Sequence, residues 1–248
     1  MSDQSPDFDR RARVYDTLRP TDDAWWQRFE TMVDLAGLRG QRILDVGCGT
    51  GRLAAALATE ARARVWAIDD SREMVAVARE TVPTQVGVRR GKAERLPFRD
   101  GWFDRVTMSL VVHLLDRPAA FAEAQRVLAH GGRIAIATFT LEHFDSYWLN
   151  PYFPSIRTID LNRFPSPAQL HEELSDAGFD EVVTEQVSTV ETISRETALS
   201  RIKGRHISTF DLLPADEVAS GTAQAEAELP AQVETRLEQL VVVGTSRG

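Results

Sequence analysis

Short apolar runs of strand length alternate with helical patterns through the first 140 residues of this 248-residue chain. Capped amphipathic segments separate the runs, and a weakly alternating segment lies at 85–90. Because parallel strands are joined by helical crossovers, the alternation predicts a parallel sheet with helices on both faces, and right-handed crossovers make it doubly wound. The buried strands are expected at 43–46, 65–68, 103–110, 133–139, 181–190 and 240–243.

The acidic balance of the chain narrows the class of partner. Asp and Glu number 37 against 29 Lys and Arg, a formal net charge of −8, whereas broad nucleic-acid binding needs a basic surface. No apolar run approaches the roughly 20 residues of a membrane span, and residues 1–19 are too polar for a secretory signal. The single cysteine, Cys48, excludes an intramolecular disulfide and a cysteine-cluster metal site. We therefore expect a cytoplasmic protein that acts on a small molecule, with no membrane partner, no nucleic-acid partner and no metal.

A glycine-rich turn, Asp45 to Gly51, follows the first strand. In a doubly wound sheet this turn lies at the carboxyl edge, where ligands bind. A dinucleotide fingerprint of the form G-x-G-x-x-G that starts at Gly47 and Gly49 would need a third glycine at position 52, which is Arg52. The match to a nicotinamide site is therefore poor. The pattern D-x-G-x-G-x-G instead resembles the first motif of the class I S-adenosylmethionine (SAM) methyltransferases.

Four further signals follow in the order found in that family. Asp69 ends the second strand about 20 residues after the first motif, where an acidic residue holds ribose hydroxyls. The other three are the loop 91–98, which resembles the adenine-side loop, Phe103-Asp104 at the start of the fourth strand, and the Arg126-Val127-Leu128 junction with its two glycines. Together they resemble most closely the type 11 methyltransferases, which include the ubiquinone/menaquinone biosynthesis C-methyltransferases.

The resemblance implies a Rossmann-like α/β fold with a doubly wound, mostly parallel sheet of seven strands and a helical lid over the carboxyl edge of the sheet. It also implies a single domain over 1–248. The cofactor-binding core is expected at 40–140, and the lid segments at 1–35, 140–165 and 191–237.

SAM is the implied cofactor and S-adenosylhomocysteine (SAH) the implied product. By resemblance, the three glycines of the turn line the methionine part of SAM and Asp45 lies near its amino group, while Tyr15 belongs to a segment that folds over the cofactor. Asp69 takes the ribose hydroxyls, Glu94 faces the adenine, and Ser109 faces the reactive methyl. The full set of expected cofactor-binding residues is Tyr15, Asp45, Gly47, Gly49, Gly51, Asp69, Asp70, Ala93, Glu94 and Ser109.

His113 is the candidate catalytic residue. It follows the fourth strand at the mouth of the expected site, and an imidazole titrates near neutral pH. A structural role for this histidine stays open. Aromatic residues that could line the pocket, or pack in the lid without touching a substrate, are His143, Tyr147, Trp148 and Tyr152, whereas Trp25 and Trp26 are expected in the core.

The sequence therefore predicts transfer of a methyl group from SAM to an O, N or C atom of a small molecule by in-line displacement. Alignment of the reacting atoms can supply about 7–11 kcal/mol of the barrier. Two alternatives remain: a non-catalytic SAM- or SAH-binding protein of the same fold, and a tRNA or rRNA methyltransferase, which the acidic charge disfavours. A monomer or a homodimer is expected.

Overall fold

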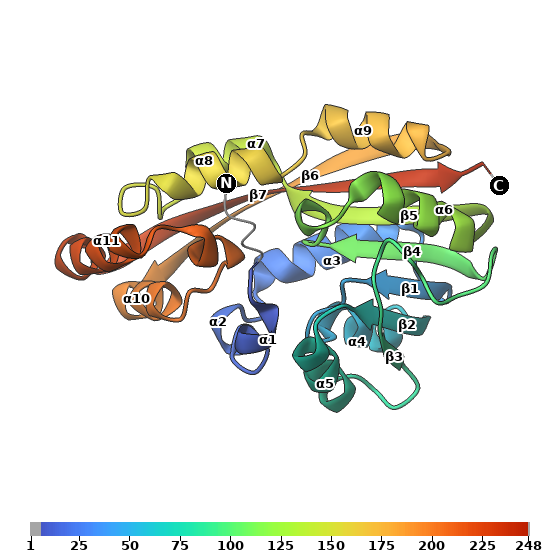
Figure 1. Ribbon diagram of the computed structural model, residues 1–248, viewed down its shortest axis with the longest axis horizontal. Coiled ribbons are helices and arrows are strands. Elements are labelled where there is room, and N and C mark those ends of the chain that lie inside the picture. Colours follow the sequence, from blue (N-terminus) through green and yellow to red (C-terminus); the bar gives the residue numbers. More distant parts are fainter. Residues whose placement is uncertain (1–5, 248) are drawn as a thin grey trace.

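Seven strands form one sheet in the order β3-β2-β1-β4-β5-β7-β6 (Figure 1). The computed structural model describes residues 6–247. Strands β1 to β5 are parallel, and β7 runs antiparallel between β5 and β6. This confirms the doubly wound, mostly parallel sheet. The strands are β1 (Arg42–Val46), β2 (Arg64–Asp69), β3 (Gly87–Arg90), β4 (Phe103–Ser109), β5 (Leu128–Phe139), β6 (Phe179–Ser194) and β7 (Gln232–Ser246).

Helices lie on both faces of the sheet (Figure 1). Within residues 6–247, no helix is long and apolar enough to cross a membrane. The α-helices are α1 (Phe8–Arg11), α2 (Tyr15–Leu18), α3 (Asp23–Ala36), α4 (Arg52–Thr59), α5 (Arg72–Thr81), α6 (Arg117–Val127), α7 (Leu141–Asp145), α8 (Ser155–Arg163), α9 (Pro167–Asp176), α10 (Arg195–Lys203) and α11 (Ala215–Glu228), with the 3₁₀ helices η1 (Val112–Leu114) and η2 (Ser208–Leu212).

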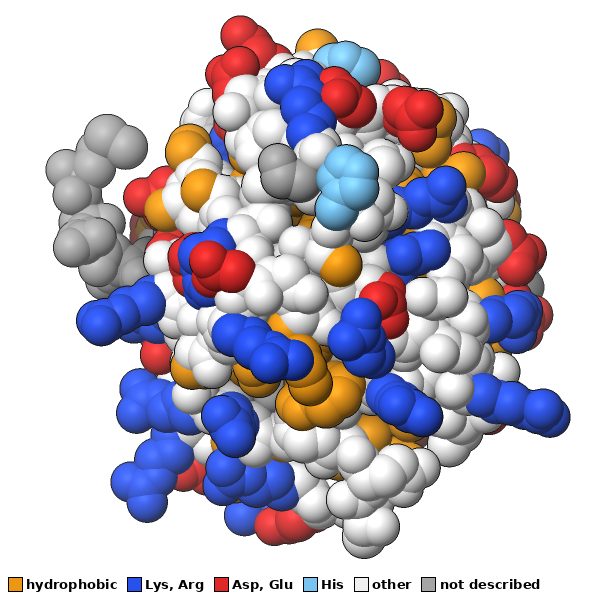
Figure 2. All heavy atoms as spheres, turned by 90° about the vertical axis from the view of Figure 1, so that its right-hand side faces the viewer, with side chains coloured by type: hydrophobic (Ala, Val, Ile, Leu, Met, Phe, Trp, Pro, Cys, Tyr) orange, Lys and Arg blue, Asp and Glu red, His pale blue; other side chains and the backbone are white. Residues whose placement is uncertain are grey.

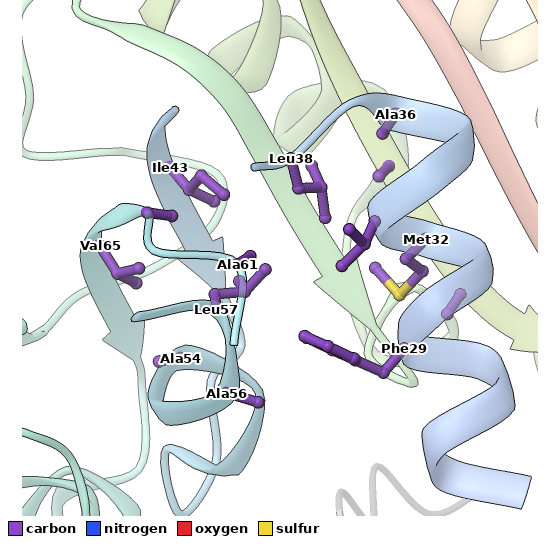
Figure 3. Close-up of a cluster of buried hydrophobic side chains, with 14 of the residues drawn as sticks. Phe29, Met32, Ala36, Leu38, Ile43, Ala54, Ala56, Leu57, Ala61 and Val65 are labelled. Atoms are coloured by element: carbon purple, nitrogen blue, oxygen red, sulfur yellow. The ribbon is translucent and has the colours of Figure 1, made fainter. Parts of the chain in front are cut away.

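The core consists of two apolar layers, one on each face of the sheet. Neighbouring residues of a strand point to opposite faces, so Ile43 of β1 packs against α3 and α4, whereas Leu44 packs against α6 and α9. Figure 3 shows Phe29 and Met32 of α3 together with Leu57 of α4 in the first layer. Burial of one such side chain contributes about 1.5–3 kcal/mol, and the paired layers fix the carboxyl ends of the parallel strands in place.

The two neighbouring tryptophans of helix α3 point in different directions. Trp25 faces the core and is 9% exposed, but Trp26 is 40% exposed. Adjacent residues of a helix lie about 100° apart and cannot share one narrow face. The expectation that both are core residues is therefore wrong for Trp26.

The last two strands are much longer than their apolar runs predict. The segments 181–190 and 240–243 mark only parts of β6 and β7, which stay paired from Phe179↔Ser246 to Ser194↔Gln232. Both strands run beyond the two core layers into a further apolar cluster, which we call the cap. Helices α8, α10, η2 and α11 contribute side chains to the cap, and α7 lies beside α8 (Figure 1). One sheet therefore supports both the core and the cap.

The side chains along one face of β7 explain why the full length of this strand is hard to recognise from the sequence. Val233 packs in the cap, and Val241 and Val243 pack in the core. Thr235, Leu237 and Gln239 lie between them on the same face and line a cavity. Polar residues at cavity positions interrupt the apolar alternation by which a strand is recognised.

The N-terminal segment connects the core to the cap. Asp9 of α1 accepts hydrogen bonds from Ser71 Oγ at 2.5 Å and the backbone N–H of Glu73 at 3.3 Å, at the start of α5. Arg11 donates to the carbonyl of Ile207 in the cap at 2.7 Å and pairs with Asp211. Residues 1–5 of the expected N-terminal lid lie outside the described residues.

Candidate active site

A cavity of about 740 Å³ opens at the carboxyl ends of β1, β2 and β4 and continues between the sheet and the cap. Its volume suits a ligand of cofactor or drug size. All but one of the residues that the sequence predicts for the site line this cavity. They are Tyr15, Asp45, Gly47, Gly49, Asp69, Asp70, Ala93, Glu94, Ser109 and His113.

Gly51 is the exception among the three glycines of the turn. All three have positive φ, at +70° for Gly47, +54° for Gly49 and +84° for Gly51. A Cβ on Gly51, however, would lie 3.1 Å from the Cβ of Ala78 in α5, and Gly51 does not line the cavity. The missing side chain of Gly51 lets α4 begin close against α5, and a contact of Gly51 with the cofactor stays a prediction.

Asp69 is held by two backbone groups at the end of β2. Its carboxylate oxygens accept hydrogen bonds from the N–H groups of Gly49 and Ser71, each at 2.9 Å. Each carboxylate oxygen has a second lone pair, so both can still accept a hydroxyl. Burial raises the pKa of Asp69 above its ordinary value. Asp70 is exposed on the rim and lies 3.5 Å from Arg90.

Asp45 carries a buried oxygen that has no partner in residues 6–247. Its Oδ1 accepts a hydrogen bond from Thr107 Oγ1 at 2.8 Å, but Oδ2 has none. The side chain is 1% exposed, and burial raises its pKa to about 7. A cation placed against Oδ2 would restore the ionised form and satisfy this oxygen. The ammonium group of an amino acid fits that requirement.

Arg28 is a site residue that the sequence reasoning missed. It lies on the buried face of α3, one turn from Trp25 and from Met32, and lines the cavity. Within residues 6–247 it forms no hydrogen bond or ion pair, and burial, together with the nearby Arg19 cation, lowers its pKa to about 10. A buried cation without a counter-ion is costly unless a ligand supplies the anion. The available signal was an arginine at core spacing within an apolar stripe.

The loop 91–98 forms the wall near β3. Ala93 is buried against the cavity, and Glu94 accepts a hydrogen bond from the N–H of Asp116 at 3.2 Å. Arg126 of α6 donates to two carbonyl oxygens of this loop, at 2.9 and 3.0 Å. The motif at the end of α6 therefore holds the loop in position.

Tyr15 lies over the glycine turn because its neighbour is bound there. Asp16 accepts a hydrogen bond from Thr50 Oγ1 at 2.8 Å and pairs with Arg52. Tyr15 itself accepts a hydrogen bond from Arg19 Nη1 at 2.8 Å and lines the cavity. The N-terminal segment is thus bound to the glycine turn and to the start of α4.

Residues after β4 lead from the turn to the acceptor side of the cavity. Ser109 and Leu110 line the wall, and Leu110 has φ +54°, a strained conformation that is concentrated at functional sites. The ring of His113 stacks on Phe164 with centroids 4.0 Å apart, and its Nδ1 has no partner among residues 6–247. Burial and the charge of Arg163 hold the pKa of His113 well below its ordinary value, so the ring is neutral at pH 7.

The far part of the cavity is an aromatic chamber against the cap. His143 stacks on Phe139 at 4.3 Å, and Tyr147 and Trp148 complete this wall. Tyr152, the fourth aromatic residue considered for the wall, does not line the cavity and packs in the cap instead. The chamber borders the carboxyl end of β4, so it adjoins the glycine turn without a dividing wall.

The end of the molecule away from the cap differs in character from the site. Figure 2 shows this end, with many Lys and Arg side chains around a small hydrophobic area. The net charge of −8 is therefore unevenly distributed. The cavity lies at the opposite, carboxyl edge of the sheet.

Comparison with known proteins agrees with this geometry. A model of the methyltransferase domain, type 11, matches residues 44–136. The malonyl-[acyl-carrier protein] O-methyltransferase of Herminiimonas arsenicoxydans is 32% identical over 203 residues, which cover 79% of this chain and 74% of that protein. The ubiquinone/menaquinone biosynthesis C-methyltransferase UbiE of Rubrivivax gelatinosus is 36% identical over 130 residues, 52% of this chain and 49% of that protein.

A solved structure shows the same fold over most of the chain. It is a methyltransferase assigned to an antibiotic biosynthesis pathway of Anabaena variabilis, with a TM-score of 0.68, 24% identity, and coverage of 87% of this chain and 96% of that one. The chain spans about half the length of several of the curated relatives that it matches. The match to the Herminiimonas protein extends over most of both chains, so this chain belongs to the SAM-dependent methyltransferases of type 11.

Proposed function

We propose that this protein transfers a methyl group from SAM to an O, N or C atom of a small-molecule acceptor. The observation that carries the proposal is the single cavity that joins the glycine turn to the aromatic chamber. A SAM molecule seated on the turn would direct its methyl group past Ser109 into the chamber. An acceptor in the chamber would then meet it without crossing bulk water.

The residues around the turn suit the three polar parts of SAM. The free Oδ2 of Asp45 suits the ammonium group, and the unpaired guanidinium of Arg28 suits the carboxylate. Asp69 retains two acceptor positions for the ribose hydroxyls. A Cβ on Gly47 would meet the side chain of Val111, which also lines the cavity, so the turn needs glycine there.

The chemistry needs alignment more than acid–base assistance. SAM supplies an activated methyl group whose leaving group departs as a neutral thioether. The chain would hold SAM by Asp45, Arg28 and Asp69, and the aromatic walls would exclude water and orient the acceptor. His113 stays our candidate catalytic residue, because it lines the cavity just after β4 and its Nδ1 has no partner among residues 6–247.

We further propose a cytoplasmic enzyme that works as a monomer or homodimer. The acidic net charge of −8 supports the absence of a nucleic-acid partner. A non-catalytic SAM-binding protein would share the turn and Asp69. Only an assay of methyl transfer separates these two.

The test is calorimetric titration with SAH, followed by a screen for methyl transfer from SAM to small molecules. We expect the wild type to bind SAH and Asp69→Ala to bind it at least tenfold more weakly. Asp34→Ala is the matched control, because Asp34 is exposed on α3 and does not line the cavity. NAD is the control ligand. Binding of NAD but not SAH by the folded wild type would overturn the proposal.

A further inference from the structure

Arg19 brings a positive charge into the acceptor chamber. Its Nη1 donates to Tyr15 OH at 2.8 Å, and its guanidinium carbon lies 5.4 Å from the centre of the Tyr15 ring. The same charge lowers the pKa of His113, His143 and His206, three rings of the chamber wall. Arg19 and the three histidines all line the cavity, and a neutral imidazole offers the guanidinium no negative charge.

The carboxylates of the chamber are already used by other arginines. Asp160 lies 3.2 Å from Arg163, and Glu191 lies 3.2 Å from Arg201. Within residues 6–247, Arg19 forms no ion pair with any carboxylate. Asp22 also lines the cavity, but its side chain caps α3, and among residues 6–247 it forms no ion pair with Arg19 or Arg28, so both guanidiniums lack a paired carboxylate.

The cofactor does not remove this excess. Its single carboxylate could neutralise only one of these two neighbouring guanidiniums, and we assign it to Arg28, which is the more deeply buried of the two. Its sulfonium would add a further positive charge. Arg19 is left to face the acceptor.

The histidines of the chamber are poor bases. Burial lowers the pKa of His143 to about 4 and that of His206 to about 3, and holds the pKa of His113 well below its ordinary value. Moving a proton from an ordinary phenol, with a pKa of about 10, to an imidazole with a pKa of about 4 is unfavourable by a factor of about one million. An acceptor that is already ionised needs no such transfer.

We propose that the acceptor is a small planar acid, an aromatic carboxylate or an acidic phenol, which binds as its oxyanion against Arg19 and is methylated on oxygen. The proposal rests on the proposed function. The oxyanion forms the new O–C bond while the C–S bond of SAM breaks, so an anion and a sulfonium give a neutral ester or ether and a neutral thioether. No proton moves. Phe139 and Phe164, each with one face stacked on a histidine, belong to the aromatic wall that the ring of the acceptor would meet.

The test compares acids with their neutral counterparts on protein saturated with SAH. The probes are benzoate against benzamide, salicylate against salicylamide, and 4-nitrophenolate against 4-nitroanisole. We expect at least one acid to bind tenfold more tightly than its counterpart, and the pair that responds distinguishes carboxylates from phenols. Arg19→Met should abolish the preference, and Arg19→Lys should retain most of it.

Arg13→Met is the matched control on the same segment, because Arg13 is exposed and does not line the cavity. It should keep the preference of the wild type. The proposal is overturned if no acid binds more tightly than its counterpart, or if the preference survives in Arg19→Met while that variant still binds SAH. Failure of the wild type to bind SAH would overturn the proposed function as well, so the two failures are distinguishable.

Discussion

Replacement of Gly47 by alanine tests how the turn is built. The φ of +70° would cost an alanine about 1–2 kcal/mol. Its Cβ would also lie 2.9 Å from the Cβ of Val111, with the Val111 methyl groups close by, and overpacking of this kind costs about 1–3 kcal/mol. We therefore expect Gly47→Ala to lower the free energy of unfolding by about 2–5 kcal/mol and to weaken SAH binding.

Gly49→Ala separates the two causes. Its φ is +54°, but a Cβ there would meet nothing within 4 Å, so only the backbone cost of about 1–2 kcal/mol applies. Urea unfolding measures both variants. In a Val111→Ala background, Gly47→Ala should regain at least about 1 kcal/mol as a coupling energy. Equal losses for the two glycines, with no coupling to Val111, would refute this reasoning.

Three further predictions concern charge. Arg28→Met should raise the Kd for SAH at least tenfold and leave the Kd for adenosine, which has no carboxylate, unchanged in calorimetry. Arg126→Met should raise the Kd for SAH by releasing the loop 91–98, whereas Arg117→Met, which breaks a pair at the other end of α6, should not. The pKa of His143 is about 6.5 in the unfolded chain and about 4 in the folded protein, because burial disfavours the charged ring. This histidine therefore leaves the free energy of unfolding unchanged above pH 6.5 and lowers it by up to about 3 kcal/mol as the pH drops from 6.5 to 4. His143→Phe should lose less stability than the wild type across that window in urea unfolding.

The sequence predicts well the parts of this protein that local chemistry determines. The glycine turn, the acid at the end of β2 and the alternation of strand and helix depend on neighbours in the chain, and they locate the cofactor side. The sequence does not reveal that Gly51 is needed for packing against α5, because a glycine required for helix packing has the same pattern as one required by a ligand.

The acceptor side depends on contacts between distant segments. Arg19 and Arg28 reach the cavity from the N-terminal part, and His206 reaches it from the cap, so no spacing in the chain brings them together. Thr235 and Gln239 make β7 look unlike a strand because they face the cavity instead of an apolar layer. Their role follows from the cavity, which exists only in the folded chain.

Because β6 and β7 pair continuously from the core to the cap, the length of these two strands sets the depth of the acceptor chamber. The cap packs on the outer ends of these two strands, and the core packs on their inner ends. Adding two residues to each strand would move the cap outward by about 7 Å and keep every side chain on its own face. Adding one would exchange the faces and destroy both layers. A paired change of two residues along this ribbon would therefore alter the depth of the chamber and leave the cofactor site unchanged.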